Sequence, residues 1–73
     1  MKTITVLIVD DHAILRAGLK MLINSAGGIK VAGEAATGRE AVESYKKNQP
    51  DIVVLDVTLP DISGLDVARQ IRK

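Results

Sequence analysis

The 73-residue sequence predicts an α/β fold with a doubly wound parallel sheet in the strand order 2-1-3. Three short apolar runs alternate with three segments of helical period, which is the βαβαβα order of a parallel sheet. The connections between successive runs are long enough for right-handed crossovers. The first and third runs are apolar at nearly every position, whereas the second is half polar, so the second strand is expected at an edge.

The three expected strands differ in composition. Residues 4–9 are β-branched and nearly continuous in apolar character, as in a strand that is covered on both faces. Residues 30–35 include two charged side chains and a glycine, and residues 52–55 are apolar throughout. The third strand therefore needs a neighbour on its far side. Residues 1–73 are thus expected to be the first part of a larger domain.

The first expected helix, residues 12–25, places Leu15, Leu19 and Leu22 on one apolar stripe. The opposite side is polar and consists of Arg16, Lys20 and Asn24. The double glycine at 27–28 supplies the end of this helix, because a helix end often needs a positive φ.

Two capping signals open the second and third expected helices. Thr37 with Glu40 three residues later forms a capping box, and the Asn-Gln-Pro sequence at 48–50 ends that helix. A turn from Leu59 to Ser63 precedes the third helix, whose capping signal pairs Ser63 with Asp66. The expected apolar side of the third helix consists of Leu65, Ala68 and Ile71.

Composition narrows the function classes. The chain has ten Lys and Arg against nine Asp and Glu, so its net charge of +1 gives no basic footprint for nucleic acid. It has no cysteine, which excludes disulfides and thiolate zinc sites. The first apolar run is shorter than the roughly 20 residues that span a bilayer. We therefore expect a cytoplasmic protein without a membrane partner.

Acidic residues follow two of the expected strands. Asp10 and Asp11 come directly after the first strand, and Asp56 follows the third. In the order 2-1-3 these strands are neighbours, and ligands of open α/β sheets bind outside the carboxyl ends of the strands. Clustered carboxylates repel one another unless a proton or a cation lies among them. Mg²⁺ suits such oxygen ligands and is the usual companion of phosphoryl groups, with one carboxylate acting as nucleophile.

Each of these residues also has a plain structural interpretation. Asp11 is a candidate N-cap of the first helix, a role that is compatible with metal binding. His12 is interpreted as a surface or capping residue. Asp10 gains nothing as a second capping acid, and Asp56 is costly to bury after an apolar strand unless it is paired or bound to metal.

The motifs together resemble those of a bacterial response-regulator receiver domain. The start of that family is matched by residues 6–12, Val-Leu-Ile-Val-Asp-Asp-His. Its second strand and helix are matched by residues 33–41, and its third strand and loop by residues 50–60 and 63–65. The Asp-Asp-His start is most similar to the LuxR/FixJ (NarL-like) branch, whose output is a helix-turn-helix domain. The resemblance implies a flavodoxin-like, CheY-like fold.

The resemblance also implies roles for individual residues. Asp56 would be the phosphoacceptor that takes a phosphoryl group from a sensor histidine kinase. Asp10, Asp11 and Asp56 would hold Mg²⁺, with the backbone carbonyl of Thr58 as a further ligand. Such a receiver is not itself an enzyme. It would control transcription through DNA only by way of an output domain that these residues do not contain.

Two further strands of the family, with the Ser or Thr and the Lys that contact the phosphoryl group, cannot be placed in these 73 residues. One alternative is therefore a phosphorylation-incompetent fragment or a receiver-like interaction and dimerisation module. Self-association is expected through the exposed third strand, residues 52–55. A second alternative is a phosphatase of the haloacid-dehalogenase type, but Thr58 stands where that class has its second acid. No glycine-rich nucleotide loop is present.

Overall fold

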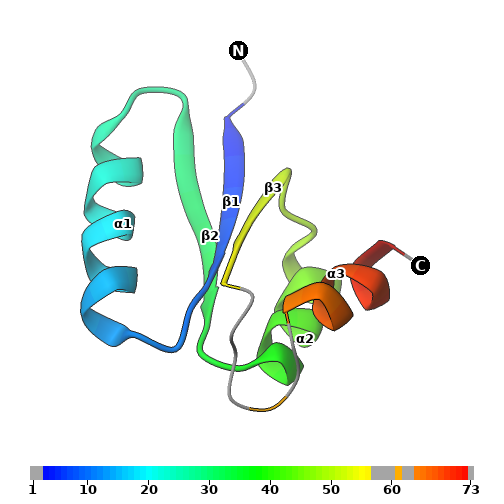
Figure 1. Ribbon diagram of the computed structural model, residues 1–73. Coiled ribbons are helices and arrows are strands. Elements are labelled where there is room, and N and C mark those ends of the chain that lie inside the picture. Colours follow the sequence, from blue (N-terminus) through cyan, green and yellow to red (C-terminus); the bar gives the residue numbers. More distant parts are fainter. Residues whose placement is uncertain (1–2, 57–60, 62–63, 73) are drawn as a thin grey trace.

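A computed structural model describes residues 3–56, 61 and 64–72 of the chain. The elements are β1 (Ile4–Val9), α1 (Ala13–Ser25), β2 (Ile29–Ala35), α2 (Gly38–Asn48), β3 (Ile52–Leu55) and α3 (Gly64–Arg72). The strands form one parallel sheet in the order β2-β1-β3. α1 covers one face of the sheet, while α2 and α3 lie on the other (Figure 1). The predicted fold class and strand order are confirmed.

The register of the sheet determines where β1 and β3, each followed by an aspartate, end relative to each other. Val9 at the end of β1 pairs with Leu55 at the end of β3. The pairing continues by one residue, because the Asp56 backbone N–H donates to the Val9 carbonyl at 2.9 Å. Asp10 and Asp56 therefore leave neighbouring strands at the same edge of the sheet.

The core lies between the sheet and the helices α2 and α3. Its buried members come from both layers and are Leu7, Val9, Ala35, Ala41 and Val67. Side chains alternate between the two faces of a strand, so the odd-numbered residues of β1 near its end face this core. The core holds α2 and α3 in place beneath the strand ends.

The face beneath α1 differs from the prediction. No residue of α1 is buried, although the structure describes the whole helix. Leu15 and Leu22 are 49% and 70% exposed. The predicted polar side instead meets the edge strand β2. Asn24, for example, accepts a hydrogen bond from the Val31 backbone N–H at 3.1 Å. The helical periodicity was therefore correct, but α1 rests on polar contacts while its apolar stripe borders an open groove.

β3 also departs from its predicted environment. A strand apolar at every position predicted cover on both faces, yet Ile52 and Val54 are 46% and 41% exposed. Val53 and Leu55 pack against the core. Among the described residues, β3 is thus covered on one face and paired along one edge.

The helix boundaries follow their sequence signals closely. Thr37 is the N-cap of α2, and its hydroxyl accepts from the Glu40 backbone N–H at 3.1 Å. Gly28 has the positive φ of 82° expected after α1. In α3, Ile71 packs against the core as predicted, whereas Leu65 is 66% exposed and Val67, which had no predicted role, is fully buried. Ser63 and residues 59–60 of the predicted turn lie outside the described residues.

None of the described helices combines the length and the apolar character that crossing a membrane requires.

Candidate functional site

Four side chains that could hold a metal ion gather at the carboxyl ends of β1 and β3. They are Asp10, Asp11, His12 and Asp56, and one ligand atom from each lies within 4.8 Å of the others. The structure thus brings together the three predicted aspartates and adds the histidine. Thr58, whose carbonyl was predicted as a further ligand, lies outside the described residues.

Asp10 is the most constrained member of this acidic cluster. It is 8% exposed, and its backbone N–H donates to the Ala35 carbonyl of β2 at 3.0 Å. Its Oδ1 accepts from the His12 backbone N–H at 2.8 Å and lies 2.7 Å from His12 Nδ1. The backbone N–H of His12, opposed by burial and helped by the imidazole, lowers the pKa of Asp10 below its usual value.

His12 joins the cluster through its side chain. It is the N-cap residue of α1 but makes no side-chain capping bond, so the predicted capping role of Asp11 is wrong. Instead, Nδ1 of His12 lies 2.7 Å from Asp10 Oδ1 and 3.1 Å from Asp11 Oδ1. The hydrogen bond to Asp10 and the charge of Asp11 raise the pKa of the imidazole. The helix begins one residue later than that role requires, because His12 rather than Asp11 occupies the N-cap position.

Arg16 connects this cluster to the edge strand. Its Nη1 donates to the backbone carbonyl of Asp10 at 2.7 Å, and its Nε donates to Glu34 Oε1 at 3.4 Å. Lys20 donates to the other oxygen of Glu34 at 3.1 Å and, with Arg16, lowers the pKa of that carboxyl. The sequence predicted a polar side of the helix here, but not its contact with Glu34. The spacing of Arg16 and Lys20, one helical turn apart, was the sequence signal that could have predicted a shared acidic partner.

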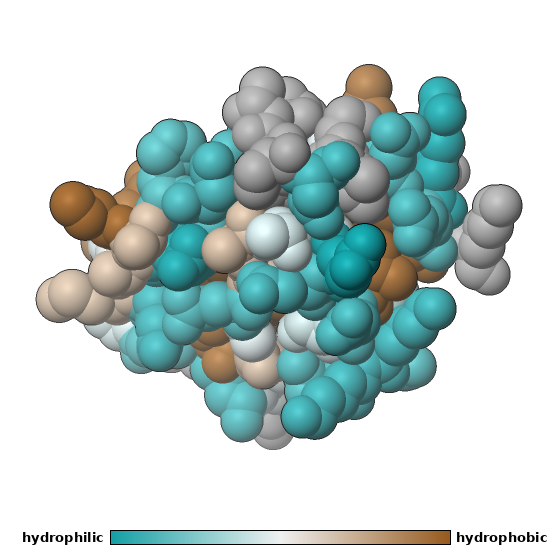
Figure 2. Space-filling model, turned by 90° about the horizontal axis from the view of Figure 1, so that it is seen from below, coloured by the Kyte–Doolittle hydropathy of each residue, from teal (hydrophilic) through white to brown (hydrophobic). Residues whose placement is uncertain are grey.

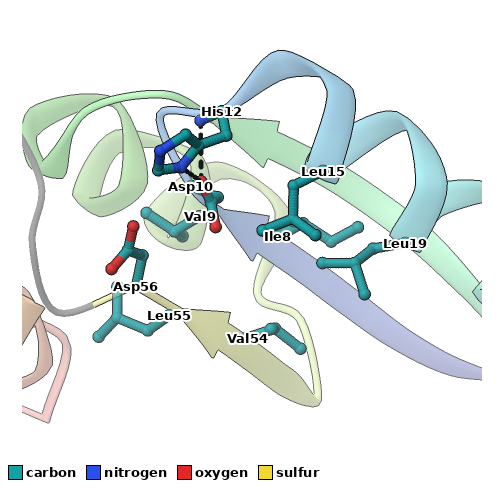
Figure 3. A pocket seen from close by; sticks show the side chains of 9 residues that line it. All are labelled: Ile8, Val9, Asp10, His12, Leu15, Leu19, Val54, Leu55 and Asp56. Carbon is teal, nitrogen blue, oxygen red and sulfur yellow. Dashed lines mark hydrogen bonds and ion pairs between the residues drawn. The ribbon is translucent and has the colours of Figure 1, made fainter.

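A groove of about 560 Å³ leads away from the cluster between α1 and β3. Asp10, His12 and Asp56 gather at one end of it, and Leu15, Leu19 and Val54 line the other (Figure 3). Seen from the carboxyl ends of the strands, the described surface is mainly hydrophilic, with apolar atoms projecting on the side of α1 (Figure 2). A polar site therefore adjoins an apolar surface.

The segment after β3 is tied to α2 by one further contact. The Asp61 carboxylate accepts hydrogen bonds from the backbone N–H groups of Gly38 and Arg39 at 2.7 and 3.0 Å. These N–H groups belong to the first turn of α2, where a helix has no internal acceptors. Sequence reasoning missed this contact because the two partners are more than 20 residues apart.

The donor atoms of the cluster fit a divalent cation. Carboxylate oxygens are the protein ligands that Mg²⁺ prefers, and it commonly takes only one or two of them and keeps several waters. Asp10, Asp11 and Asp56 supply such oxygens from two adjacent strand ends. The exposure of Asp11 and His12 leaves room for those waters.

Ligands of open parallel α/β sheets bind outside the carboxyl ends of the strands, which is where this acidic cluster lies. The family model of the response regulator receiver domain matches residues 6–73. The chain belongs to this family, and it is the receiver domain of a two-component response regulator.

Individual relatives agree with this family. The chain is 54% identical over 68 residues to the chemotaxis protein CheY of Thermotoga maritima, covering 93% of this chain and 56% of that protein. It is 43% identical over 70 residues to the response regulator UvrY of Escherichia coli, covering 96% of this chain and 32% of that protein. The solved structure of a LuxR-family response regulator from Aurantimonas has a TM-score of 0.91 and 44% identity. That match covers 97% of this chain and 51% of the other.

One relative has an enzyme's name. A protein-glutamate methylesterase/protein-glutamine glutaminase of Pyrococcus horikoshii is 49% identical over 72 residues, which are 99% of this chain and 20% of that protein. The chain thus spans about half or less of the relatives that it matches.

Proposed function

We propose that Asp56 is the phosphoacceptor of this receiver, with a sensor histidine kinase as its donor. One observation carries the proposal: ligand atoms of Asp10, Asp11 and Asp56 lie within 4.8 Å of one another at adjacent strand ends. A carboxylate oxygen of Asp56 attacks the phosphorus of a phosphohistidine. The phosphorus–nitrogen bond breaks, and its electron pair stays on the imidazole of the donor.

We propose Asp10, Asp11 and Asp56 as the carboxylates that hold Mg²⁺, with the carbonyl of Thr58 as a further ligand. Bound Mg²⁺ supplies positive charge against the phosphoryl oxygens. The chain's own contribution is to fix the acids in place. Asp10 is held through its N–H by β2 and through its carbonyl by Arg16, which supports a defined ligand position.

The experiment is the intact mass of the chain after incubation with a small phosphodonor, with and without Mg²⁺. We expect one phosphoryl group that needs both Mg²⁺ and Asp56, so that Asp56→Asn abolishes it. Asp66→Asn is a matched control because that aspartate lies on α3, outside the cluster. An adduct that persists in Asp56→Asn contradicts the site. No adduct at all favours the alternative, a phosphorylation-incompetent interaction module.

This proposal also bears on the larger protein and its output. Residues 1–73 would be the first three βα units of a receiver domain in a cytoplasmic regulator. Likeness to a LuxR-family regulator supports a DNA-binding output and control of transcription. The relative named as a methylesterase supports a different kind of output, an enzyme. We propose the DNA-binding output, with no catalytic turnover by residues 1–73 themselves.

Self-association of this chain through β3 is a second proposal. Ile52 and Val54 are exposed on one face of the strand, and among the described residues β3 pairs only with β1. An unpaired strand edge next to apolar side chains favours pairing with another copy. Light scattering is expected to show dimers or larger assemblies, and Val54→Lys should reduce them. A compact, cooperatively melting monomer would contradict this proposal.

A further inference from the structure

His12 belongs to the acidic cluster as closely as the aspartates do. Its Nδ1 lies 2.7 Å from Asp10 Oδ1 and 3.1 Å from Asp11 Oδ1, and a ring nitrogen is one of the four clustered ligand atoms. We propose that His12 is a metal ligand that widens the range of cations at this site from Mg²⁺ to Zn²⁺, Co²⁺ and Ni²⁺. This inference rests on the proposed function, in which the aspartates hold the cation.

The separations match those around a bound cation. Two ligands that each lie about 2.1 Å from an octahedral ion, at right angles, are about 3 Å apart. The distances of 2.7 and 3.1 Å from His12 Nδ1 to the two carboxylates bracket this value. A cation can therefore take the place of the hydrogen bonds once the ring turns its Nδ1 lone pair from Asp10 Oδ1 toward the ion.

Both backbone polar groups of His12 are hydrogen-bonded, which holds the residue in place. Its N–H donates to Asp10 Oδ1 at 2.8 Å, and its carbonyl accepts from the Arg16 N–H at 3.0 Å. Arg16 also donates to the Asp10 carbonyl, which links the two ligand-bearing residues. The side chain of His12 is nevertheless 66% exposed, so that ions reach it from solvent.

The donor chemistry determines which ions gain from the histidine. Mg²⁺ favours oxygen ligands, whereas imidazole nitrogen suits Zn²⁺, Ni²⁺ and similar ions. The chain has no cysteine that would compete for them. Coordination through Nδ1 requires the tautomer with its proton on Nε2, so the Nδ1–H bond to Asp10 is exchanged for a bond to the cation.

The test uses the untagged chain, in which His12 is the sole histidine and gives unambiguous imidazole signals. Binding of Zn²⁺ and of Mg²⁺ is measured by calorimetry, and the His12 ring nitrogens are followed by NMR. Zn²⁺ should shift one ring nitrogen strongly, and Mg²⁺ should not. His12→Ala should weaken Zn²⁺ binding by at least about the 10- to 100-fold that loss of an outer-shell partner costs, with little change for Mg²⁺.

His12→Asn is the matched control. Its amide can still donate a hydrogen bond to Asp10 but offers no nitrogen lone pair to a metal. Equal loss of Zn²⁺ affinity in both variants supports coordination by His12. Retained affinity in His12→Asn overturns the inference, because the ring then acts only through its hydrogen bond. Binding of Mg²⁺ without any Zn²⁺ effect on the ring overturns it while leaving the proposed function intact. Binding of neither ion overturns both.

Discussion

The two faces of the sheet are built differently. On the face of α2 and α3, Leu7 and Ala41 are completely buried, and the helices close over the sheet. On the face of α1, Ile8 of β1 is also completely buried, but Leu22 of the helix is 70% exposed, and the helix contacts β2 through Arg16 and Lys20. The groove that ends at the acidic cluster lies on the face of α1. The helices are thus closely packed on one face of the sheet and largely open to solvent on the other.

The largest test of this division compares two identical substitutions. Leu7→Ala should lower the free energy of unfolding by about 2–5 kcal/mol, because a fully buried leucine leaves a cavity. Leu22→Ala on the exposed side of α1 should change it by less than about 0.5 kcal/mol. Urea unfolding of both variants measures the difference. A similar loss for Leu22→Ala would mean that the α1 face is covered in solution.

Two glycines sharpen the same comparison. An added Cβ at Gly33 would meet Ser44 Oγ at 2.8 Å and Asn48 Nδ2 at 3.0 Å, whereas one at Gly18 would meet nothing within 4 Å. Gly33→Ala should therefore destabilise by about 1 kcal/mol, since overpacking outweighs the gain in chain entropy. Gly18→Ala should stabilise α1 by about 0.5–1 kcal/mol.

Thermal unfolding of the two glycine variants measures both the expected loss of stability and the expected gain. Adding Ser44→Ala to Gly33→Ala should recover part of the loss, because it removes the nearest atom. Equal effects at both glycines would refute the difference between the faces.

The N-cap of α2 gives a smaller test. Thr37 Oγ1 caps α2 by accepting from the Glu40 N–H, so Thr37→Ala should cost about 1 kcal/mol. Thr37→Ser keeps the hydroxyl and should retain most of the stability. Chemical denaturation distinguishes the variants, and an equal loss for both would show that the methyl group, not the cap, matters.

The smallest expected effect is a shift in the titration of His12. Its pKa should lie above the usual value of about 6.5, chiefly because of the hydrogen bond to Asp10. The imidazolium then stabilises the fold fully below pH about 6.5, and this contribution is lost as the pH rises through the pKa of folded His12. Asp10, whose pKa is lowered, contributes above its usual value of about 3.9 and loses this as the pH falls through its folded pKa.

NMR titration of the His12 ring measures this directly. Asp10→Asn should lower the pKa of His12, while Asp66→Asn, outside the cluster, should leave it unchanged. An unaltered His12 titration in Asp10→Asn would show that Asp10 does not set it.

Much of this structure could be predicted from the sequence. Strand periodicity and composition placed β2 at an edge and β1 in the centre, and that order put Asp10 and Asp56 side by side. Local signals were also reliable, since Thr37 caps α2 as its motif predicted. These features depend on near neighbours in the chain or on the topology of parallel sheets.

What sequence reasoning missed depends on contacts between distant residues. Burial of Val67 in place of Leu65 reflects how α3 is rotated against α2, which the helical period alone does not specify. The hydrogen bonds from the first turn of α2 to Asp61 likewise join residues too far apart in sequence for a local pattern to predict. His12 is 66% exposed at the N-cap position, as its interpretation as a surface or capping residue predicted, but its contact with Asp10 and Asp11 was missed. A lone histidine carries no spacing signal for the acids beside it.

The strand order has a consequence for the way this chain folds. The central strand is the first in sequence, and its pairing with β3 joins residues 46 positions apart, as between Val6 and Ile52. Non-local pairings of this kind slow folding, because a long loop must close before any contact compensates for it. In a partly folded chain in which only β1, α1 and β2 have assembled, the side of β1 that pairs with β3 is therefore still unpaired. We expect the arrival of β3, which also brings Asp56 to the site, to be the late and rate-limiting step.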